Sequence, residues 1–345
     1  MSKEIAEILA RYSKINNFPM MIIASRNQAD YDSGYVGNSM QLSMIVQPFR
    51  NTNFLLCRDH CGPYFSDLDK GLTVEQAIER CKKTIDRDLE SDFDLIHIDV
   101  SRIPERQLDY AKELIDYALS INPDIMLEFG GEDNNGVDIE LSAKNLQTQL
   151  DFLQQYKKNI VFVVTQTGSL TKDGQVGGFD ILRNEKIKEQ IEAAGFLFKE
   201  HNADYFTKQD IDDRINAGID SLNIAPQLGR IQTDLLKELA PADLWEKFGD
   251  HVYNQNYWQR WVGPGVTDKD IAVSVSGHYC FNSNEYKDII SNIDYNEFKN
   301  ELSTRITALV EFYKTFSDEN SEARFQKILR KRLEELRRRD PFIYR

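Results

Sequence analysis

Short apolar runs alternate with amphipathic segments along the first two thirds of this chain. The runs are almost continuously apolar, which is typical of strands buried on both faces of a parallel sheet. Seven runs have this character, and they lie at residues 18–25, 53–59, 93–101, 124–131, 159–168, 195–201 and 218–226. The pattern therefore predicts a series of β-then-α units.

The segments between these runs carry helix start and stop signals. Thr73 and Gln76 have the spacing of a capping box at the start of one predicted helix. Residues 105–120 place their apolar side chains on one helical face. Gly195 and Gly218 follow two further amphipathic segments and suit helix C-termini.

Consecutive β-then-α units favour an α/β fold of the TIM (β/α)8-barrel type over an open sheet. Open doubly wound sheets usually carry a glycine-rich first turn, and no GxGxxG motif occurs in this chain. A closed barrel needs eight strands, whereas the pattern supplies seven. We therefore expect either an eighth strand at residues 270–281 or an incomplete barrel, in a barrel domain that covers residues 1–240.

Residues 241–345 differ in character from the predicted barrel. Aromatic side chains crowd between Trp245 and Trp261, and long polar helices follow. The last helix carries an apolar stripe from Phe325 to Leu336 between arginines, which favours a capping or subunit-contact helix over a nucleic-acid-binding one. We expect this helical C-terminal extension to pack on the barrel or on a partner subunit.

The composition, 41% hydrophobic and 28% charged, is that of a soluble globular protein. A formal net charge of −14 argues against nucleic-acid and anionic-membrane surfaces, which need a basic footprint. No apolar run approaches the length of a membrane span, and the first residues lack a signal sequence. Four cysteines without CxxC spacing predict reduced thiols, so we expect a cytoplasmic protein.

Polar side chains gather where the predicted strands end. Barrels of this type carry their reactive groups at the C-terminal ends of the strands and in the loops that follow. The candidate residues, taken strand by strand, are Arg26, Asn27, Gln28, Arg58, Asp59, His60, Asp99, Glu132, Gln166, His201 and Asn223. A purely structural sheet would have no reason to collect polar groups at one end.

Three of these residues have the chemistry of a metal site. His60 and His201, together with Glu132, form a set of two imidazoles and a carboxylate that suits Zn²⁺ or another divalent cation. Asp59 is expected to project differently from His60, either as a proton shuttle or as a residue that orients a loop. His97 lies within a predicted strand and could point inward behind the ligands.

Three arginines near the strand ends offer planar donors for a phosphate or carboxylate group. They are Arg26, Arg58 and Arg102, and we expect one or two of them to be structural.

At these same positions the sequence resembles the Z-type subunit of class II tagatose-1,6-bisphosphate aldolase. The similarity extends from Met20 to about Ile290 and keeps the family's order of motifs. The matching segments are SRNQADYDSGYVGN (25–38), RDHCGP (58–63), IHIDVS (96–101), GGE (130–132), VVTQTG (163–168), EHNADY (200–205) and LNIAP (222–226).

The resemblance implies a TIM barrel of the class II aldolase type. It places the family's Asp-His pair on Asp59 and His60, its glutamate on Glu132 and its histidine on His201. The family's first strand has no counterpart here, so the resemblance implies a barrel with an atypical or missing first strand.

One departure from the family lies beside a candidate ligand. The family's Glu-Ala-His segment corresponds to Lys199-Glu200-His201, so a lysine replaces an acid. Lys199 is either a buried, salt-bridged lysine or a Schiff-base lysine of the class I aldolase type.

These features together predict a metal-dependent lyase that cleaves or forms a ketose phosphate by retro-aldol and aldol chemistry. In this hypothesis a divalent ion held by His60, Glu132 and His201 polarises the sugar, while Asp59 moves a proton. The alternatives are a retro-aldol sugar epimerase and a non-catalytic stabilising subunit of a class II aldolase. Expected substrate contacts are Arg26, Asn27, Gln28, Arg58, Asp99, Gln166, Lys199 and Asn223.

The expected partners follow from the same hypothesis. They are a phosphorylated sugar and either further copies of this chain or a Y-type aldolase subunit, with neither nucleic acid nor membrane.

Overall fold

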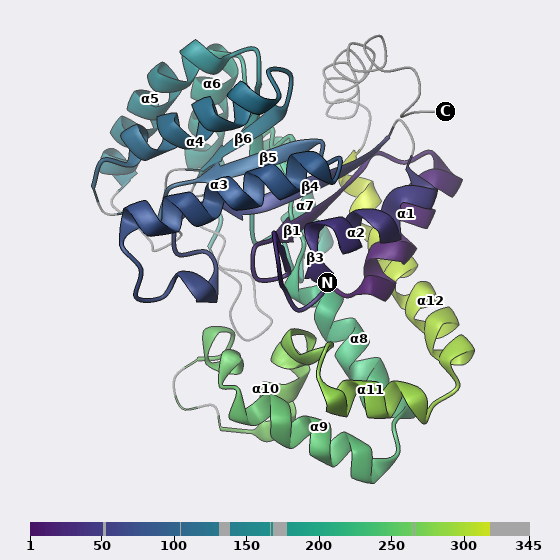
Figure 1. The fold of residues 1–345 in the computed structure, drawn as a ribbon. Helices are drawn as coiled ribbons and strands as arrows, with labels where there is room; N and C mark the ends of the chain where they lie inside the picture. The colour runs from purple at the N-terminus through teal and green to yellow at the C-terminus, as the bar shows by residue number, and fades with distance from the viewer. Residues whose placement is uncertain are drawn as a thin grey trace.

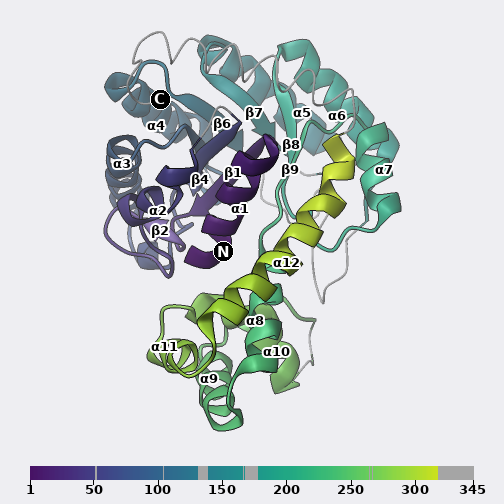
Figure 2. The same cartoon turned by 90° about the vertical axis from the view of Figure 1, so that its right-hand side faces the viewer.

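Seven parallel strands form one curved sheet in the order β1-β4-β5-β6-β7-β8-β9, whose first strands are labelled in Figure 1 and whose last strands are labelled in Figure 2. The computed structural model describes residues 1–50, 53–103, 105–130, 139–165, 167, 178–263, 265 and 267–317. The strands are β1 Met20–Ser25, β4 Phe54–Cys61, β5 Leu95–Asp99, β6 Met126–Gly130, β7 Ile160–Val164, β8 Leu197–Glu200 and β9 Ser221–Leu222. Each predicted apolar run overlaps one of them, so the predicted strand series is confirmed, and only β4 extends past its run, to Cys61. A short parallel pair, β2 Ala29–Asp30 and β3 Gly37–Asn38, follows β1.

The concave face of the sheet is apolar at the amino end of the strands. Leu55, Leu95, Met126 and Leu197 pack there with Phe162 in one buried cluster. Because alternate residues of a strand point to the same face, each strand continues from this cluster towards its carboxyl end with a further set of inward side chains. Those later positions are polar, which sets the location of the site.

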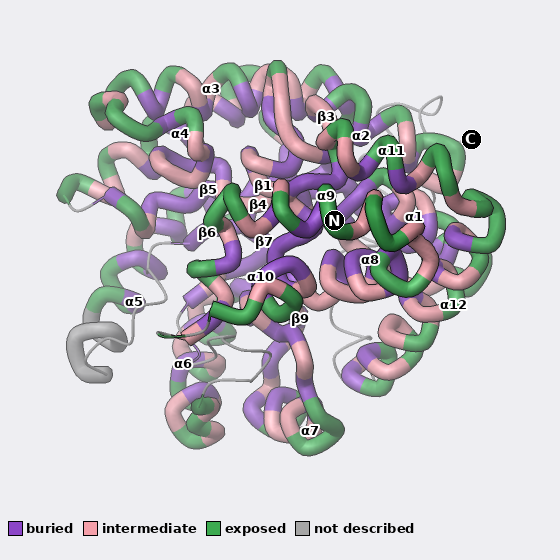
Figure 3. Tube along the Cα trace, turned by 90° about the horizontal axis from the view of Figure 1, so that it is seen from below, coloured by how far each residue is buried: buried purple, intermediate pink, exposed green. Residues whose placement is uncertain are grey.

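Helices cover the convex face of the sheet. They are α2 Ser39–Val46, α3 Val74–Glu90, α4 Gln107–Ile121, α5 Ile139–Leu153, α6 Ile181–Ala194 and α7 Lys208–Asn216. The predicted capping box between Thr73 and Gln76 starts α3, and Gly195 ends α6 with a φ of 88°. Seen from below, the central strands are buried and the helices expose their outer faces (Figure 3).

The sheet does not close into a full barrel within the described residues, because β1 and β9 lie at its two edges. Between these edges lies a cavity of about 210 Å³ lined by residues such as Met20, Met21, Ser221 and Leu222. Helix α1 (Lys3–Asn16) and helix α12 (Tyr295–Lys314) pack on one another over this seam (Figure 2).

The predicted eighth strand at residues 270–281 is wrong, because this segment forms helix α10 (Lys269–Ser276) followed by a 3-10 turn, Gly277–Cys280. The side chain of Asp268 caps α10 by accepting hydrogen bonds from the backbone N–H groups of Asp270 and Ile271. One face of this helix is buried and the other is exposed: the buried residues are Ala272, Val273, Val275 and Ser276, and Ile271 is exposed. In the sequence, a short apolar run does not distinguish such a helix from a buried strand.

Helix α8 leads from the sheet to the helical extension, which then returns to the barrel. Helices α8 Pro226–Leu239, α9 Ala242–Asn254, α10 and α11 Asn284–Ser291 lead away from the sheet, and α12 runs back beside α1 (Figures 1 and 2). The remaining 3-10 turns are Gln47–Phe49, Asp67–Asp69, Gln154–Tyr156, Tyr257–Arg260 and Thr315–Ser317. The predicted last helix, Phe325 to Leu336, lies outside the described residues. Among the described helices, none has the length and apolarity of a membrane span.

Candidate metal centre

A β-bulge at the end of β4 turns two consecutive side chains towards the inside of the barrel. Arg58 pairs with Ile96 and Cys61 pairs with Ile98, so Asp59 and His60 together face one residue of β5. His60 adopts the left-handed backbone region with a φ of 46°, which is uncommon for a residue other than glycine. The bulge therefore corrects our expectation that Asp59 and His60 project differently.

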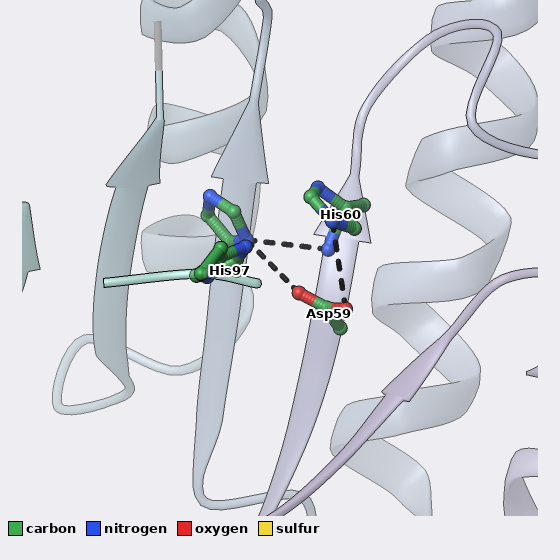
Figure 4. A group of neighbouring side chains, drawn as sticks. Asp59, His60 and His97 are labelled. Atoms are coloured by element: carbon green, nitrogen blue, oxygen red, sulfur yellow. Dashed lines mark hydrogen bonds and ion pairs between the residues drawn. The ribbon is translucent and has the colours of Figure 1, made fainter. Parts of the chain in front are cut away.

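Three imidazoles meet inside the barrel at this bulge. His97 is one of the inward-facing residues of β5, and His201 follows the last residue of β8. The centroids of the His60, His97 and His201 rings are 5.1 Å to 5.2 Å apart in all three pairs. Asp59 joins them, with one carboxylate oxygen 3.3 Å from Nδ1 of His97 and the other 3.6 Å from Nε2 of His60 (Figure 4).

These distances fit a divalent ion held by nitrogen and oxygen donors. Around a tetrahedral Zn²⁺, with metal–nitrogen bonds of about 2.0–2.1 Å, three imidazole centroids are roughly 5 Å apart. One donor atom from each of Asp59, His60, His97 and His201 can be chosen so that all four lie within 4.8 Å of one another. In addition, Nε2 of His97 is buried without a hydrogen-bond partner among the described residues. We infer that the donor set suits zinc or a similar ion.

Asp99 and Phe65 hold the His60 ring in place. The carboxylate of Asp99 lies 2.5 Å from Nδ1 of His60, which leaves Nε2 available to an ion. The ring of Phe65 stacks on the imidazole with a centroid separation of 4.6 Å and an angle of 4°. Burial opposes a charge on His60, but Asp59 and Asp99 together outweigh it and raise the pKa of His60 to about 9, so an ion that binds Nε2 must displace its proton.

Glu128 and Lys199 form a buried ion pair directly beside His201. Nζ of Lys199 lies 2.6 Å from one carboxylate oxygen of Glu128, and Nε2 of His201 lies 3.1 Å from the other. Both charged side chains are 1% exposed. Burial would raise the pKa of Glu128, but Lys199, His97 and His201 together outweigh burial and lower that pKa to about 2. Glu128 is therefore an ionised acceptor that can fix the tautomer of the His201 ring.

The pKa values of Asp59 and His201 suit metal binding. Burial would raise the pKa of Asp59, but His60 and the other two imidazoles hold it well below its usual range. Burial lowers the pKa of His201, which favours its neutral form. At neutral pH the cluster thus offers an ionised carboxylate and a neutral imidazole, both of which metals bind.

Two predicted substrate contacts, Arg26 and Arg58, lie inside the protein and contact carboxylates there. Arg26 donates to both oxygens of Asp69 at 2.6 Å and 3.1 Å, and Arg58 donates to both oxygens of Asp88 at 2.6 Å and 2.7 Å. Both arginines are at most 1% exposed. Arg26 thereby ties β1 to the 3-10 turn Asp67–Asp69, and Arg58 ties β4 to α3.

Other predicted contacts also take part in local structure. Asn27 accepts a hydrogen bond from the backbone of Asp67, and Gln28 accepts one from the backbone of Ser25. Asn223 is buried at the end of β9, and its Nδ2 has no hydrogen-bond partner among the described residues. The candidates Glu132 and Gln166 lie outside the described residues.

The structure brings in residues that sequence reasoning placed elsewhere or missed. His97 belongs to the cluster itself, and its alternate spacing from Leu95 and Asp99 gave a signal for an inward position. Glu128 has the same kind of signal, since an acid interrupts the apolar run of β6. Phe65 has none, because it lies in an irregular loop.

Comparisons with known proteins bear on the fold. No family model matches this chain, and no curated protein sequence matches it. A solved structure from Sinorhizobium meliloti 1021, described as a "probable tagatose 6 phosphate kinase", superposes with a TM-score of 0.71 at 16% identity and covers 91% of this chain and 97% of its own. A fructose-bisphosphate aldolase from Campylobacter jejuni superposes with a TM-score of 0.53 at 12% identity, covering 90% and 87%. At these identities the likeness shows a shared fold.

Proposed function

We propose that this protein is a metal-dependent enzyme of the aldolase type, which makes or breaks a carbon–carbon bond next to a hydroxyl group in a phosphorylated sugar. The observation that carries the proposal is the triangle of His60, His97 and His201, with ring centroids 5.1 Å to 5.2 Å apart. The likeness in fold to an aldolase supports it, since the strand ends of both folds can carry the same kind of site.

The proposed ligands are the three imidazoles, and Asp59 lies beside them as the proposed base. A divalent ion bound there supplies Lewis acidity to the carbonyl and the neighbouring hydroxyl oxygen of the sugar. Asp59 is ionised and lies against two of the imidazoles, so it accepts the proton of the hydroxyl whose carbon–carbon bond is cleaved. The reverse transfer returns that proton in the condensation direction.

The surrounding residues hold these groups in position. Asp99 orients His60 through Nδ1, and Glu128 orients His201 through Nε2. Because Lys199 neutralises Glu128, the site gains an acceptor without gaining a net negative charge. The 2.6 Å ion pair supports a structural role for Lys199 over a Schiff-base role.

The test is to measure metal content and turnover on the same preparations. The purified chain should contain a stoichiometric divalent metal and should release dihydroxyacetone phosphate from a ketose bisphosphate. His60→Ala and His201→Ala should each weaken metal binding by about 100-fold or more and abolish turnover, since each removes one ligand.

His251→Ala is the matched control. His251 lies in α9, is partly exposed and pairs with Glu285 at 3.6 Å, so its loss should leave metal and turnover unchanged. Turnover that survives both ligand substitutions in the presence of EDTA would refute the proposal. A metal-loaded protein that inverts a hydroxyl centre without releasing an aldehyde would make it an epimerase with the same site.

A further inference from the structure

Arg102 is an exposed cation beside the metal cluster that has no carboxylate partner among the described residues. Its Nη1 donates one hydrogen bond, to the backbone carbonyl of Tyr64 at 2.7 Å. Arg26 and Arg58 are bound bidentately by aspartates, and Arg260 lies 3.2 Å from Asp67. The charge of Arg102 therefore has no role in the internal ion pairs of this region.

Arg102 is held in place by an aromatic ring that also contacts a proposed ligand. Its guanidinium carbon lies 4.1 Å from the centroid of the Phe65 ring, within cation–π range. The ring of Phe65 stacks in turn on His60 at 4.6 Å. Guanidinium, phenyl ring and imidazole therefore form consecutive layers that begin at the metal cluster.

We propose that Arg102 binds the oxyanion group of the substrate, a phosphate or carboxylate, whose reacting end lies at the cluster of Asp59, His60, His97 and His201. This inference rests on the proposed function and names the residue that selects an anionic sugar. A guanidinium presents a planar fork of donors that matches such oxyanions. With one donor fixed by Tyr64, the remaining N–H groups of Arg102 are available to the ligand.

The charge of the whole chain strengthens the argument. A protein with a formal net charge of −14 repels an anionic ligand unless its site is locally positive. Asp59 and Asp99 lie within the same site, so the bound ion alone would be largely neutralised. The nearby guanidinium of Arg102 restores the positive potential that a sugar phosphate requires.

The main experiment compares Arg102→Met with Arg106→Met in steady-state kinetics. Arg106 is a matched control because it too is exposed and stacks on an aromatic ring, Tyr110 at 5.4 Å, but it pairs with Asp109. We expect R102M to raise KM for a phosphorylated ketose by about 100-fold with little change in kcat. The KM for the unphosphorylated sugar should stay the same, and Arg102→Lys should lie between R102M and the native protein.

A second arm uses a sugar acid in place of the sugar phosphate. A larger KM effect of R102M on the acid than on the phosphate would assign the subsite to carboxylates. The reverse result would assign it to phosphates. Either outcome supports an oxyanion subsite and shows whether the substrate's anionic group is a phosphate or a carboxylate.

A third arm is independent of metal and of turnover. Binding of inorganic phosphate is measured by calorimetry in the His201→Ala background, where the proposed metal is lost. We expect phosphate to bind His201→Ala and to lose that binding when Arg102→Met is added. If this arm succeeds while the native chain shows no metal and no turnover, the anion site stands and the proposed function fails.

The inference is overturned if R102M and R106M have the same KM for every anionic substrate and the same phosphate binding. Metal content of R102M, expected to equal that of the native protein, shows that the cluster itself is intact.

Discussion

At the scale of single residues, the site depends on buried groups of opposite charge that compensate one another. Lys199 and Glu128 are each 1% exposed and lie 2.6 Å apart, so either charge alone would be strongly destabilising at that depth. His201 depends on the same carboxylate through Nε2. The ion pair therefore affects both the stability of the fold and the orientation of a proposed ligand.

Lys199→Met should destabilise the protein by roughly 3–5 kcal/mol, because it leaves Glu128 buried without its partner. The double variant Glu128→Gln/Lys199→Met should recover most of that stability, since the pair becomes neutral. Its metal affinity should remain about 10- to 100-fold below the native value, because His201 loses its charged acceptor. Chemical denaturation and metal titration measure the two effects. Native metal affinity in the double variant would show that the pair does not orient His201.

Asp204 should make stability depend on pH. Its carboxylate is 1% exposed and accepts backbone hydrogen bonds from Ala225 and Gln227, and burial raises its pKa to about 7. In the unfolded chain this carboxyl ionises near its ordinary value, so folding is favoured at low pH. That contribution is lost as the pH rises from about 4 through about 7, and it amounts to roughly 3–4 kcal/mol.

Asp204→Asn is the variant that isolates this effect. Asparagine does not ionise, so the free energy of unfolding of native protein minus that of Asp204→Asn should fall between pH 4 and pH 8. Denaturant unfolding at several pH values measures the difference. A difference that is constant over this range would show that Asp204 ionises normally in the folded state.

The chemical type of the site residues could be predicted from the sequence more easily than the direction in which their side chains point. Asp59, His60 and His201 could be predicted because they lie at or next to the ends of apolar runs, where barrel sites form, whereas His97 lies within its run and was expected behind the ligands. The bulge that points Asp59 and His60 the same way left no signal, since it depends on the pairing of β4 with β5. The internal ion pairs of Arg26 and Arg58 also left no signal in the sequence, because their aspartate partners lie 43 and 30 residues away along the chain. Both arginines were therefore predicted to contact the substrate.

At the scale of elements, β6 shapes the site through a residue without a side chain. A Cβ atom on Gly130 would lie 2.6 Å from Nε2 of His97, which is closer than non-bonded atoms approach. The end of β6 thus leaves space that the imidazole occupies.

Gly130→Ala should therefore displace His97. We expect metal affinity to fall by about 10-fold or more and stability by about 1–3 kcal/mol, as for other overpacked sites. Gly178→Ala is the matched control, because no atom of the described residues lies within 4 Å of the position that its methyl group would take. Metal titration and thermal unfolding measure both, and unchanged metal affinity in Gly130→Ala would exclude His97 as a ligand.

Elements with strong local signals were the predictable part of this fold. The capping box at Thr73 and the glycine at 195 mark helix ends through backbone hydrogen bonds that involve only near neighbours. Residues 270–281 carry no local signal that separates strand from helix, because a short apolar run fits a strand or a buried helix equally well. The packing of this segment against α8 selects the helix. Next to that contact, Gly277 lies close to Thr233 of α8.

At the scale of the whole molecule, the helical extension contacts the loop that supports the site. Arg260, in the 3-10 turn after α9, lies 3.2 Å from Asp67, two residues beyond Phe65. Beside this contact lies a cavity of about 360 Å³, which is lined on one side by this loop and on the other by parts of the extension around Tyr257 and Tyr279. The extension is therefore connected to the stack of Phe65 on His60 through one short segment of chain.

The seam between β1 and β9 has a consequence for the size of the barrel opening. In a closed cylinder, backbone hydrogen bonds around the full circumference fix the diameter. Here the circumference is completed by side-chain packing of α1 and α12, which tolerates small sliding movements that a hydrogen-bonded ladder does not. The strands that carry the imidazoles are joined by one continuous ladder from β4 to β8, so the packing of these two helices affects the imidazole spacing only through the curvature of the whole sheet.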